Sequence, residues 1–229
     1  MSSFLLKIRR RETPFYNKLY LILKRIRAVN FPVIYPLHRF LYYEFRLRRN
    51  LWRGLWKFIY YEPLFKSQCE SVGKGLHLVG GIPLIQGHLR IILGNNVSLH
   101  GRSTFTGSKV FESPTLRVGN NTVLGDQLQI SVGCDVTIGD NVLIAGGVCI
   151  YSCDQHCLNP AERHLAPPPA TSRPVIIEDS VWIGEKCTIL KGVMIGRNSI
   201  VAAGTTVTKD VPHDSIVKGP QALVTPLIY

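Results

Sequence analysis

His156 is the residue whose type and setting best suit acid–base chemistry in this chain. It lies in a stretch, 154–174, that interrupts an otherwise regular pattern and carries the motif HCLNPAER. An imidazole can act as a general base because its unperturbed pKa is near neutrality. Interruptions of this length inside a regular fold are usually functional. His156 is therefore the first candidate base. His164, in the same stretch, is the second candidate, and an ordinary surface position is the simpler interpretation for it.

Three cysteines close to His156 raise the question of a metal site. Cys149, Cys153 and Cys157 are spaced four residues apart. Structural zinc sites usually combine two closely spaced pairs across a longer span, and this chain has no second pair. Cys149 also falls within the regular pattern, where a small apolar residue is an ordinary filler. We therefore expect no metal here.

The element that must position His156 is a repeat with a period of six. Neither a helix, with a period of 3.6, nor a plain strand, with a period of 2, explains this spacing. Short parallel strands joined by tight turns do explain it, and such hexads are typical of parallel β-helices. Small or β-branched residues follow each apolar residue by four positions. The apolar series after the interruption is Ile177, Ile183, Ile189, Ile195, Val201 and Val207.

The same period continues before the interruption. It passes through Val118 and Leu124, and a second series comprises Val132, Ile138, Ile144 and Ile150. A slip of two residues between 129 and 135 indicates a bulge or loop in one coil. We therefore predict an all-β solenoid over 67–217, with 154–174 as an active-site loop and 218–229 as a C-terminal tail.

Residues 1–66 differ physically from the rest of the chain. They contain 15 of the 27 Lys and Arg residues but only 3 of the 15 Asp and Glu residues, so they carry the whole net charge of +12. They also contain 16 of the 21 aromatic residues. Apolar residues recur at helical spacing from Phe15 to Val29 and from Leu47 to Phe58, with basic residues beside them, and Pro32 and Pro36 break the pattern between them.

Basic, aromatic-rich amphipathic helices are typical of segments that lie in a membrane interface. No apolar run in 1–66 is long enough to span a bilayer. The alternative is that these helices cap the solenoid, with solvated arginines. Nucleic acid is not an expected partner, because no recognised binding module accompanies the basic segment. Six cysteines, and a start without the apolar core of a secretory signal, favour a reducing, cytoplasmic setting on the inner face of the membrane.

The hexads, the HCLNPAER loop and the segments VWIG and IVAAGTTVTKDVP together resemble the hexapeptide-repeat acyltransferases. The nearest branch is that of the galactoside and maltose O-acetyltransferases, and the resemblance covers roughly 93–220. It does not cover 1–66, where that branch carries a different, non-basic helical segment.

The resemblance implies a left-handed parallel β-helix that assembles as a homotrimer, with active sites between neighbouring subunits. His156 would be the general base for direct acyl transfer from acetyl-CoA, or another acyl-CoA, to a hydroxyl group. No nucleophilic Cys or Ser is required. The backbone N–H of Glu185 would stabilise the oxyanion of the tetrahedral intermediate.

Further residues receive roles from the same resemblance. Coenzyme A would contact Trp182, Ala203, Thr208 and Lys209, although packing on the coil is an equal alternative for Trp182. The acceptor would face Asp126 and Gln127, which stand where the family often has an asparagine. The family's basic C-terminal ending is replaced by Leu223, which leaves Lys218 as another group for the coenzyme A phosphates.

The sequence thus predicts a CoA-dependent O-acyltransferase docked on the cytoplasmic membrane face, with a sugar or glycolipid acceptor such as a polysaccharide or lipopolysaccharide precursor. A non-catalytic β-helix scaffold tethered to the membrane is the alternative, favoured by the altered C-terminal motif. A metal-dependent hydratase of the carbonic anhydrase type would need three well-placed histidine ligands, and His156 has no obvious companions.

Overall fold

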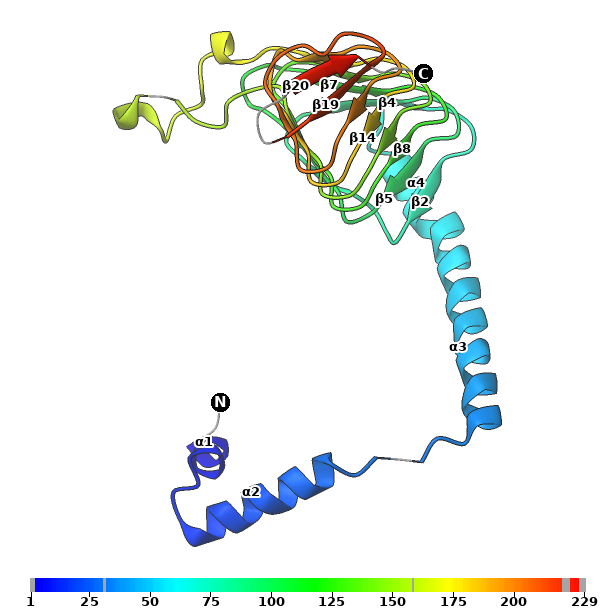
Figure 1. Cartoon of the computed structure of the whole chain (residues 1–229), viewed down its shortest axis with the longest axis vertical. Coiled ribbons are helices and arrows are strands. Elements are labelled where there is room, and N and C mark those ends of the chain that lie inside the picture. Colours follow the sequence, from blue (N-terminus) through cyan, green and yellow to red (C-terminus); the bar gives the residue numbers. More distant parts are fainter. Residues whose placement is uncertain (1–2, 31, 158, 220–222, 227–229) are drawn as a thin grey trace. The chain divides into compact units, whose positions relative to one another are not determined.

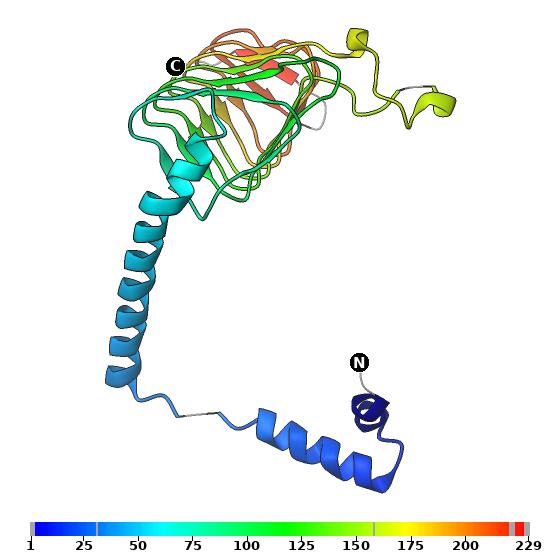
Figure 2. The same cartoon turned by 180° about the vertical axis from the view of Figure 1, so that it is seen from behind.

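The computed structural model describes residues 3–30, 32–157, 159–219 and 223–226. The chain divides into two compact units, 1–52 and 53–229, which we describe separately. Figure 1 traces both along the sequence and Figure 2 gives the reverse view.

The N-terminal part is helical, as its amphipathic pattern predicts. The helices are α1 (Ser3–Arg10), α2 (Pro14–Arg27), α3 (Tyr35–Trp56), η1 (Lys57–Tyr61) and α4 (Glu62–Lys66). Thr13 caps α2, because its hydroxyl accepts a hydrogen bond from Tyr16 N at 3.4 Å. The sequence pattern places Pro36 in the break between two predicted helices. In the structure it lies instead in the first turn of α3, where a backbone N–H would have no helical partner.

None of the helices in the described parts of the chain combines the length and apolar character required to cross a bilayer.

The second unit is a parallel β-solenoid whose strands form three sheets, one on each side of the coil. The first sheet contains β1 (Ser71–Val72), β4 (Arg90–Leu93), β7 (Thr115–Val118), β10 (Val136–Ile138), β13 (Val175–Ile177) and β16 (Met194–Ile195). The second contains β2 (His77–Val79), β5 (Ser98–His100), β8 (Val123–Leu124), β11 (Leu143–Ile144), β14 (Trp182–Ile183), β17 (Ile200–Val201), β19 (Ser215–Lys218) and β20 (Leu223–Pro226). The third contains β3 (Leu84–Gln86), β6 (Thr104–Gly107), β9 (Gln129–Val132), β12 (Cys149–Tyr151), β15 (Thr188–Ile189) and β18 (Thr206–Val207).

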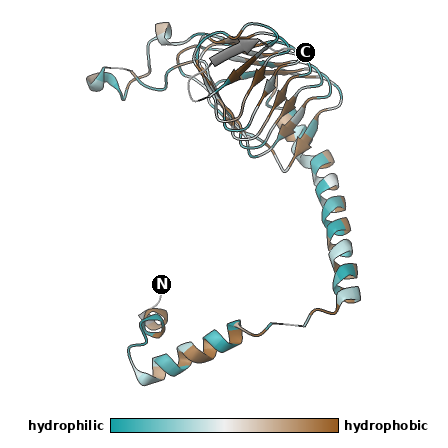
Figure 3. Cartoon of the chain, in the orientation of Figure 1, coloured by the Kyte–Doolittle hydropathy of each residue, from teal (hydrophilic) through white to brown (hydrophobic). Residues whose placement is uncertain are grey.

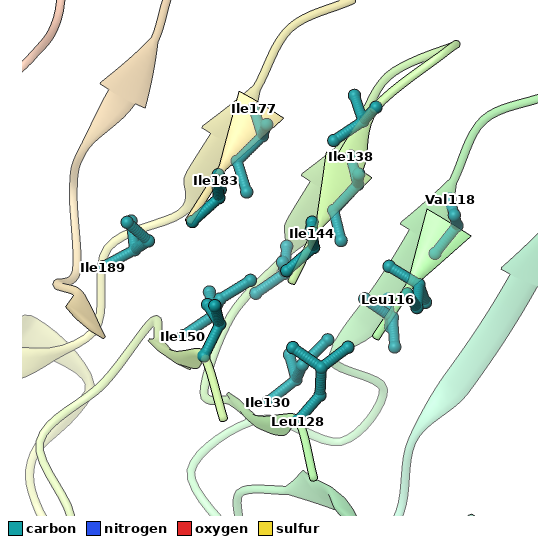
Figure 4. Close-up of a cluster of buried hydrophobic side chains, with 14 of the residues drawn as sticks. Leu116, Val118, Leu128, Ile130, Ile138, Ile144, Ile150, Ile177, Ile183 and Ile189 are labelled. Atoms are coloured by element: carbon teal, nitrogen blue, oxygen red, sulfur yellow. The ribbon is translucent and has the colours of Figure 1, made fainter. Parts of the chain in front are cut away.

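The hexads explain this architecture. Ile177 pairs in parallel register with Ile138 on one side and Ile195 on the other, so three hexads make one coil. Each apolar residue of the repeat is buried, and Figure 4 shows these side chains in rows along the solenoid interior. The strands accordingly appear hydrophobic in Figure 3. The predicted hexapeptide β-helix with an N-terminal helical segment is confirmed, and its coil is consistent with the left-handed class.

The small residues four positions after each apolar residue fill the corners of the coil. Val181, Cys187 and Ser199 are all buried. Corners also stack closely: a Cβ on Gly184 would come within 2.6 Å of Ala203 N. Left-handed backbone recurs at the corners, for instance at Asn121 and Asn141, and asparagine tolerates it well.

The slip in the repeat is an enlarged corner between β9 and β10. Ile130 and Val132 are both buried in β9, and two additional residues follow before the pattern resumes in β10. The buried Ser152 side chain stabilises this corner by two hydrogen bonds. Its hydroxyl accepts a hydrogen bond from Gly133 N at 2.8 Å and donates one to Cys134 O at 3.0 Å.

The first coil is closed by α4. Phe65 is fully buried and belongs to the same apolar core as the strands, with Tyr61 packed against it. At the other end β20 pairs antiparallel with β19, whose Lys218 lies opposite Leu223. Of the predicted tail, 220–222 and 227–229 lie outside the described residues.

Candidate functional site

The interruption of the hexads is a loop that leaves the third sheet after β12 and returns to the first sheet at β13. Figure 1 shows it projecting away from the coil, with two short 3-10 turns, η2 (Pro160–Glu162) and η3 (Pro169–Thr171). Its base is fixed at both ends. Asp154 forms an ion pair with Lys191 of the next coil, and Arg173 N donates to Ser152 O at 2.9 Å.

Among the described residues, one hydrogen bond holds the His156 ring within this loop. Its Nδ1 lies 2.9 Å from the carbonyl oxygen of Arg163. A carbonyl oxygen can only accept, so Nδ1 carries the proton in this arrangement. In the neutral ring the other nitrogen, Nε2, then has a free lone pair, and the exposed His156 ring can offer it to a proton donor.

The loop and an earlier turn enclose a cavity of about 310 Å³. One wall comes from the segment after β6, including Ser108 and Lys109, and the other from the loop, including His156 and His164. Both histidines therefore face one cavity. Lys109 is exposed and makes no ion pair with any described residue, whereas the one acidic lining residue, Asp154, is paired with Lys191.

Four of the other predicted site residues lie at the corner between the second and third sheets. Asp126 and Gln127 follow β8, Glu185 follows β14 and Ala203 follows β17. Within the described chain no hydrogen bond engages the backbone N–H of Glu185. The same holds for the equivalent amides of Asp126, Gly146 and Ala203, so this corner presents a row of free donors.

Asp126 is not free. Arg102, one coil earlier, forms an ion pair with its carboxylate, and His100 Nδ1 lies 3.9 Å from Asp126 Oδ1. The hydrogen bond from Arg102 holds the pKa of Asp126 below its usual value, and the positive charge of Arg102 adds to the effect. Asp126 therefore remains a carboxylate at neutral pH.

The remaining predicted residues occupy two further places. Thr208 and Lys209 are exposed after β18, at the corner between the third and first sheets from which the His156 loop also leaves. Trp182 points outward from β14, in register with Leu143 and Ile200 of the neighbouring coils, and half of its surface is exposed.

One chain therefore brings only part of the predicted site together. His156 shares its corner with Thr208 and Lys209, whereas the residues near Glu185 belong to a different corner of the coil. The assigned roles of these residues stay predictions.

The sequence reasoning missed the wall supplied by Ser108 and Lys109. The sequence does contain a sign of this wall. The buried residues Phe105 and Leu116 are separated by more than one hexad, and Pro114 lies near the end of that interval. Such an interval indicates a second loop at the same kind of corner as the His156 loop.

Among the described residues no group of three or more His, Cys, Asp or Glu side chains is arranged to hold a metal ion. Cys149 is not the core filler that the sequence predicts. Ile150 takes the inward position, so its neighbour Cys149 points outward and is partly exposed.

Known proteins similar to this chain in sequence or structure support both the hexapeptide repeat and the fold. Residues 174–209 match the family model of the bacterial transferase hexapeptide, six repeats. The chain is 39% identical over 104 residues to a galactoside O-acetyltransferase of Escherichia coli, covering 45% of this chain and 50% of the relative. It is 32% identical over 122 residues to a galactoside O-acetyltransferase of Lactococcus lactis, covering 53% and 55%.

The solved structures include an N-acyltransferase of Bacillus cereus in complex with a dTDP-linked amino sugar and coenzyme A. It superimposes with a TM-score of 0.57 at 21% identity, over 72% of this chain and 87% of that one, and thus shares the fold. The chain spans about half the length of the two curated relatives. The predicted resemblance to the hexapeptide-repeat transferases is confirmed, and the similarity to galactoside O-acetyltransferases supports the predicted branch.

Proposed function

We propose that this protein is a CoA-dependent O-acetyltransferase that acetylates a hydroxyl group of a sugar. The observation that carries the proposal is His156, which lines the cavity and donates its Nδ1–H to the Arg163 carbonyl, so that Nε2 is left to act as a base. The similarity to two galactoside O-acetyltransferases supports acetyl transfer and a sugar acceptor.

In the proposed step, His156 Nε2 removes the proton of an acceptor hydroxyl as that oxygen attacks the thioester carbonyl of acetyl-CoA. A C–O bond forms, and the tetrahedral oxyanion collapses with cleavage of the C–S bond. The imidazolium returns its proton to the departing thiolate, so the products are the acetyl ester and coenzyme A. No covalent enzyme intermediate is needed.

The free amide of Glu185 is a suitable donor for the oxyanion. It lies at a different corner from His156 in the same chain, and this separation supports a homotrimer in which two subunits complete each site. An exposed apolar row on the second sheet, formed by Val123, Leu143 and Trp182, offers a face for such packing.

We propose that coenzyme A runs along the corner that carries Ala203, with Lys209 or Lys218 near its phosphates. All three residues are exposed, and both lysines lack an ion pair with any described residue. Trp182 would then wall the acyl site from the neighbouring face.

We also place the enzyme on the cytoplasmic face of the membrane, bound through 1–66, with a lipid-linked or polysaccharide precursor as acceptor. The support is physical: this segment carries the whole net charge of +12 and exposes large apolar side chains. Among the most exposed are Phe15, Ile26, Phe40, Leu51 and Phe58. Such side chains are favourable in a bilayer interface and costly in water.

The catalytic proposal is tested by incubating the full chain with acetyl-CoA and a panel of sugars and glycolipids. We expect ester formation that His156→Ala lowers by roughly 10² to 10⁴ in kcat, the usual contribution of a general base. The matched control, His164→Ala, should retain more activity. Calorimetry with coenzyme A separates this function from a scaffold. Absence of both transfer and binding would favour the scaffold.

Membrane placement is tested with vesicles containing anionic lipid. Because Phe65 belongs to the solenoid core, the truncation should remove 1–52 only, at the boundary of the compact unit. We expect the full chain to sediment with the vesicles and the truncated chain to stay in solution. Equal sedimentation of the two would contradict the placement.

A further inference from the structure

A cavity of about 530 Å³ in the N-terminal unit lies between α1 and α2. The two helices meet through an edge-to-face contact of Phe4 with Tyr16, with ring centroids 6.0 Å apart. Ile8 is the one buried side chain among the described residues of this unit. One of the residues that line the cavity, Ile8, is therefore buried between the helices and not exposed to solvent.

Its lining combines apolar and cationic groups. Leu5, Ile8 and Leu23 supply the apolar part. The cationic and aromatic part comes from Arg9, Lys24, Arg27 and Tyr20. Arg11 lies 4.1 Å from the centre of the Tyr20 ring and braces that wall.

Among the described residues, none serves as a counter-ion to the three cations. The only acidic residue near them in sequence, Glu12, is paired with Arg10, and no described carboxylate forms an ion pair with Arg9, Lys24 or Arg27. Like charges that converge on one cavity repel each other unless an anion joins them. Arginine and lysine are the usual ligands of phosphate groups, which they bind by charge-assisted hydrogen bonds.

A different face of α2 carries the apolar stripe that runs through Phe15, Ile22 and Ile26. With that stripe in the bilayer interface, the cavity would lie at the depth of the lipid headgroups. An anionic lipid matches both parts of the lining, since its phosphate fits the cations and its chains fit Leu5 and Leu23.

We propose that the cavity between α1 and α2 binds the phosphate headgroup of an anionic lipid. This inference rests on the membrane placement given above and adds a specific site to it. It distinguishes headgroup recognition from the general attraction of a basic segment to a negative surface, which contributes about 1 kcal/mol for each basic residue near the surface, whether or not it lines the cavity.

The test uses the full chain and dihexanoyl phosphatidic acid as a monomeric, water-soluble probe, with binding followed by calorimetry. The pocket triple variant carries Arg9→Gln, Lys24→Gln and Arg27→Gln. The control triple, Lys7→Gln, Lys18→Gln and Arg25→Gln, removes the same charge from the same two helices at residues that do not line the cavity. Circular dichroism checks that both variants keep their helices.

We expect saturable binding by the wild type with one lipid per chain. The pocket triple should lose about tenfold or more in affinity, the scale of one charge-assisted hydrogen bond, and the control triple about twofold or less. Dihexanoyl phosphatidylcholine should bind more weakly, because its headgroup has no net charge. Leu23→Asn should weaken binding of the lipid but not of glycerol phosphate.

Equal losses in the two triples, or no saturable binding by the wild type, would overturn the site. Glycerol phosphate that binds as tightly as the lipid would show a soluble phosphate ester as the ligand and would also overturn it. Vesicle sedimentation of the same proteins tests the membrane placement separately: if the two triples lose the same calorimetric affinity for the lipid but the wild type sediments with the vesicles, the placement stands and the pocket is excluded. Acetyl transfer to a soluble sugar tests the enzyme independently.

Discussion

At the scale of single residues, the proposed acid–base chemistry depends on the hydrogen bond between His156 and the Arg163 carbonyl. The Arg163 carbonyl accepts from Nδ1 and fixes both the ring orientation and the position of its proton. This arrangement resembles the general logic of catalytic histidines, in which one nitrogen is occupied so that the other can act. The HCLNPAER motif thus contains both the proposed base, His156, and the residue whose carbonyl orients it, Arg163.

Lys109 lines the cavity next to His156 and makes no ion pair with any described residue, and a prediction follows from its charge. Lys109→Met removes the charge while keeping most of the side-chain volume. For an acceptor with a phosphate or carboxylate, we expect its KM to rise about tenfold, because a charge-assisted hydrogen bond is lost. The KM for acetyl-CoA should stay constant. Steady-state kinetics measure both.

The control for that experiment is Lys74→Met, which removes the same group from an exposed lysine at another corner of the coil. An unchanged acceptor KM in Lys109→Met, or an equal rise in the control, would remove Lys109 from the site.

The ion pair between Arg102 and Asp126 predicts a pH dependence of stability. Because the pKa of Asp126 is lowered in the folded protein, the pair stabilises the fold above the ordinary aspartate pKa of about 3.9. This contribution is lost as the pH falls through the lowered, folded-state pKa. Asp126→Asn should therefore lower the unfolding temperature slightly at pH 7 and leave it unchanged under strongly acidic conditions. Calorimetric scans across pH provide the measurement, and a difference that grows towards acid would contradict it.

At the scale of secondary-structure elements, the hexad ties each strand to the core through one inward side chain. In β16, Ile195 is fully buried whereas its neighbour Met194 is 42% exposed. We expect Ile195→Ala to cost about 2–5 kcal/mol in the free energy of unfolding, because it leaves a cavity in a packed interior.

Met194→Ala is the matched control, and it should cost much less because the methionine side chain points outward from the same strand. Denaturant unfolding followed by circular dichroism gives both values. Equal costs would mean that the inward and outward positions are not distinguished in solution.

At the scale of the whole molecule, the two halves of the proposed site lie at different corners of one chain. If neighbouring subunits of a trimer complete the site, two inactive variants can restore each other. His156→Ala removes the base, and Ala203→Trp blocks the exposed coenzyme A corner without touching the core.

Random mixing of the two variants during refolding should restore about a quarter of wild-type activity, since a quarter of the interfaces would pair an intact histidine loop with an intact corner. Each variant refolded alone should stay inactive. No recovery in mixed trimers, verified by a tag on one variant, would place the complete site within one subunit.

Much of the architecture followed from the sequence because the period of six admits few alternatives. The inward positions of a narrow coil require apolar residues, and its corners require small ones. Residues such as Ile177 and Cys187 at these positions therefore indicate a β-helix from the sequence alone. The helical spacing of the basic segment was equally readable. The slip between 129 and 135 was visible as a change of phase, and the structure identifies it as the corner held by Ser152.

The site could be predicted only in part. The sequence by itself determined the repeat, the loop that interrupts it and the histidine in that loop, because these depend on local spacing and residue type. Only the tertiary structure decided that Lys109 and His156 line the same cavity, that Arg163 orients the ring, and that Glu185 lies at a different corner. Coil stacking brings distant residues together in an order that depends on the number of residues in every intervening turn. A loop carbonyl can reach an imidazole only once the loop has folded, and no local pattern records that contact.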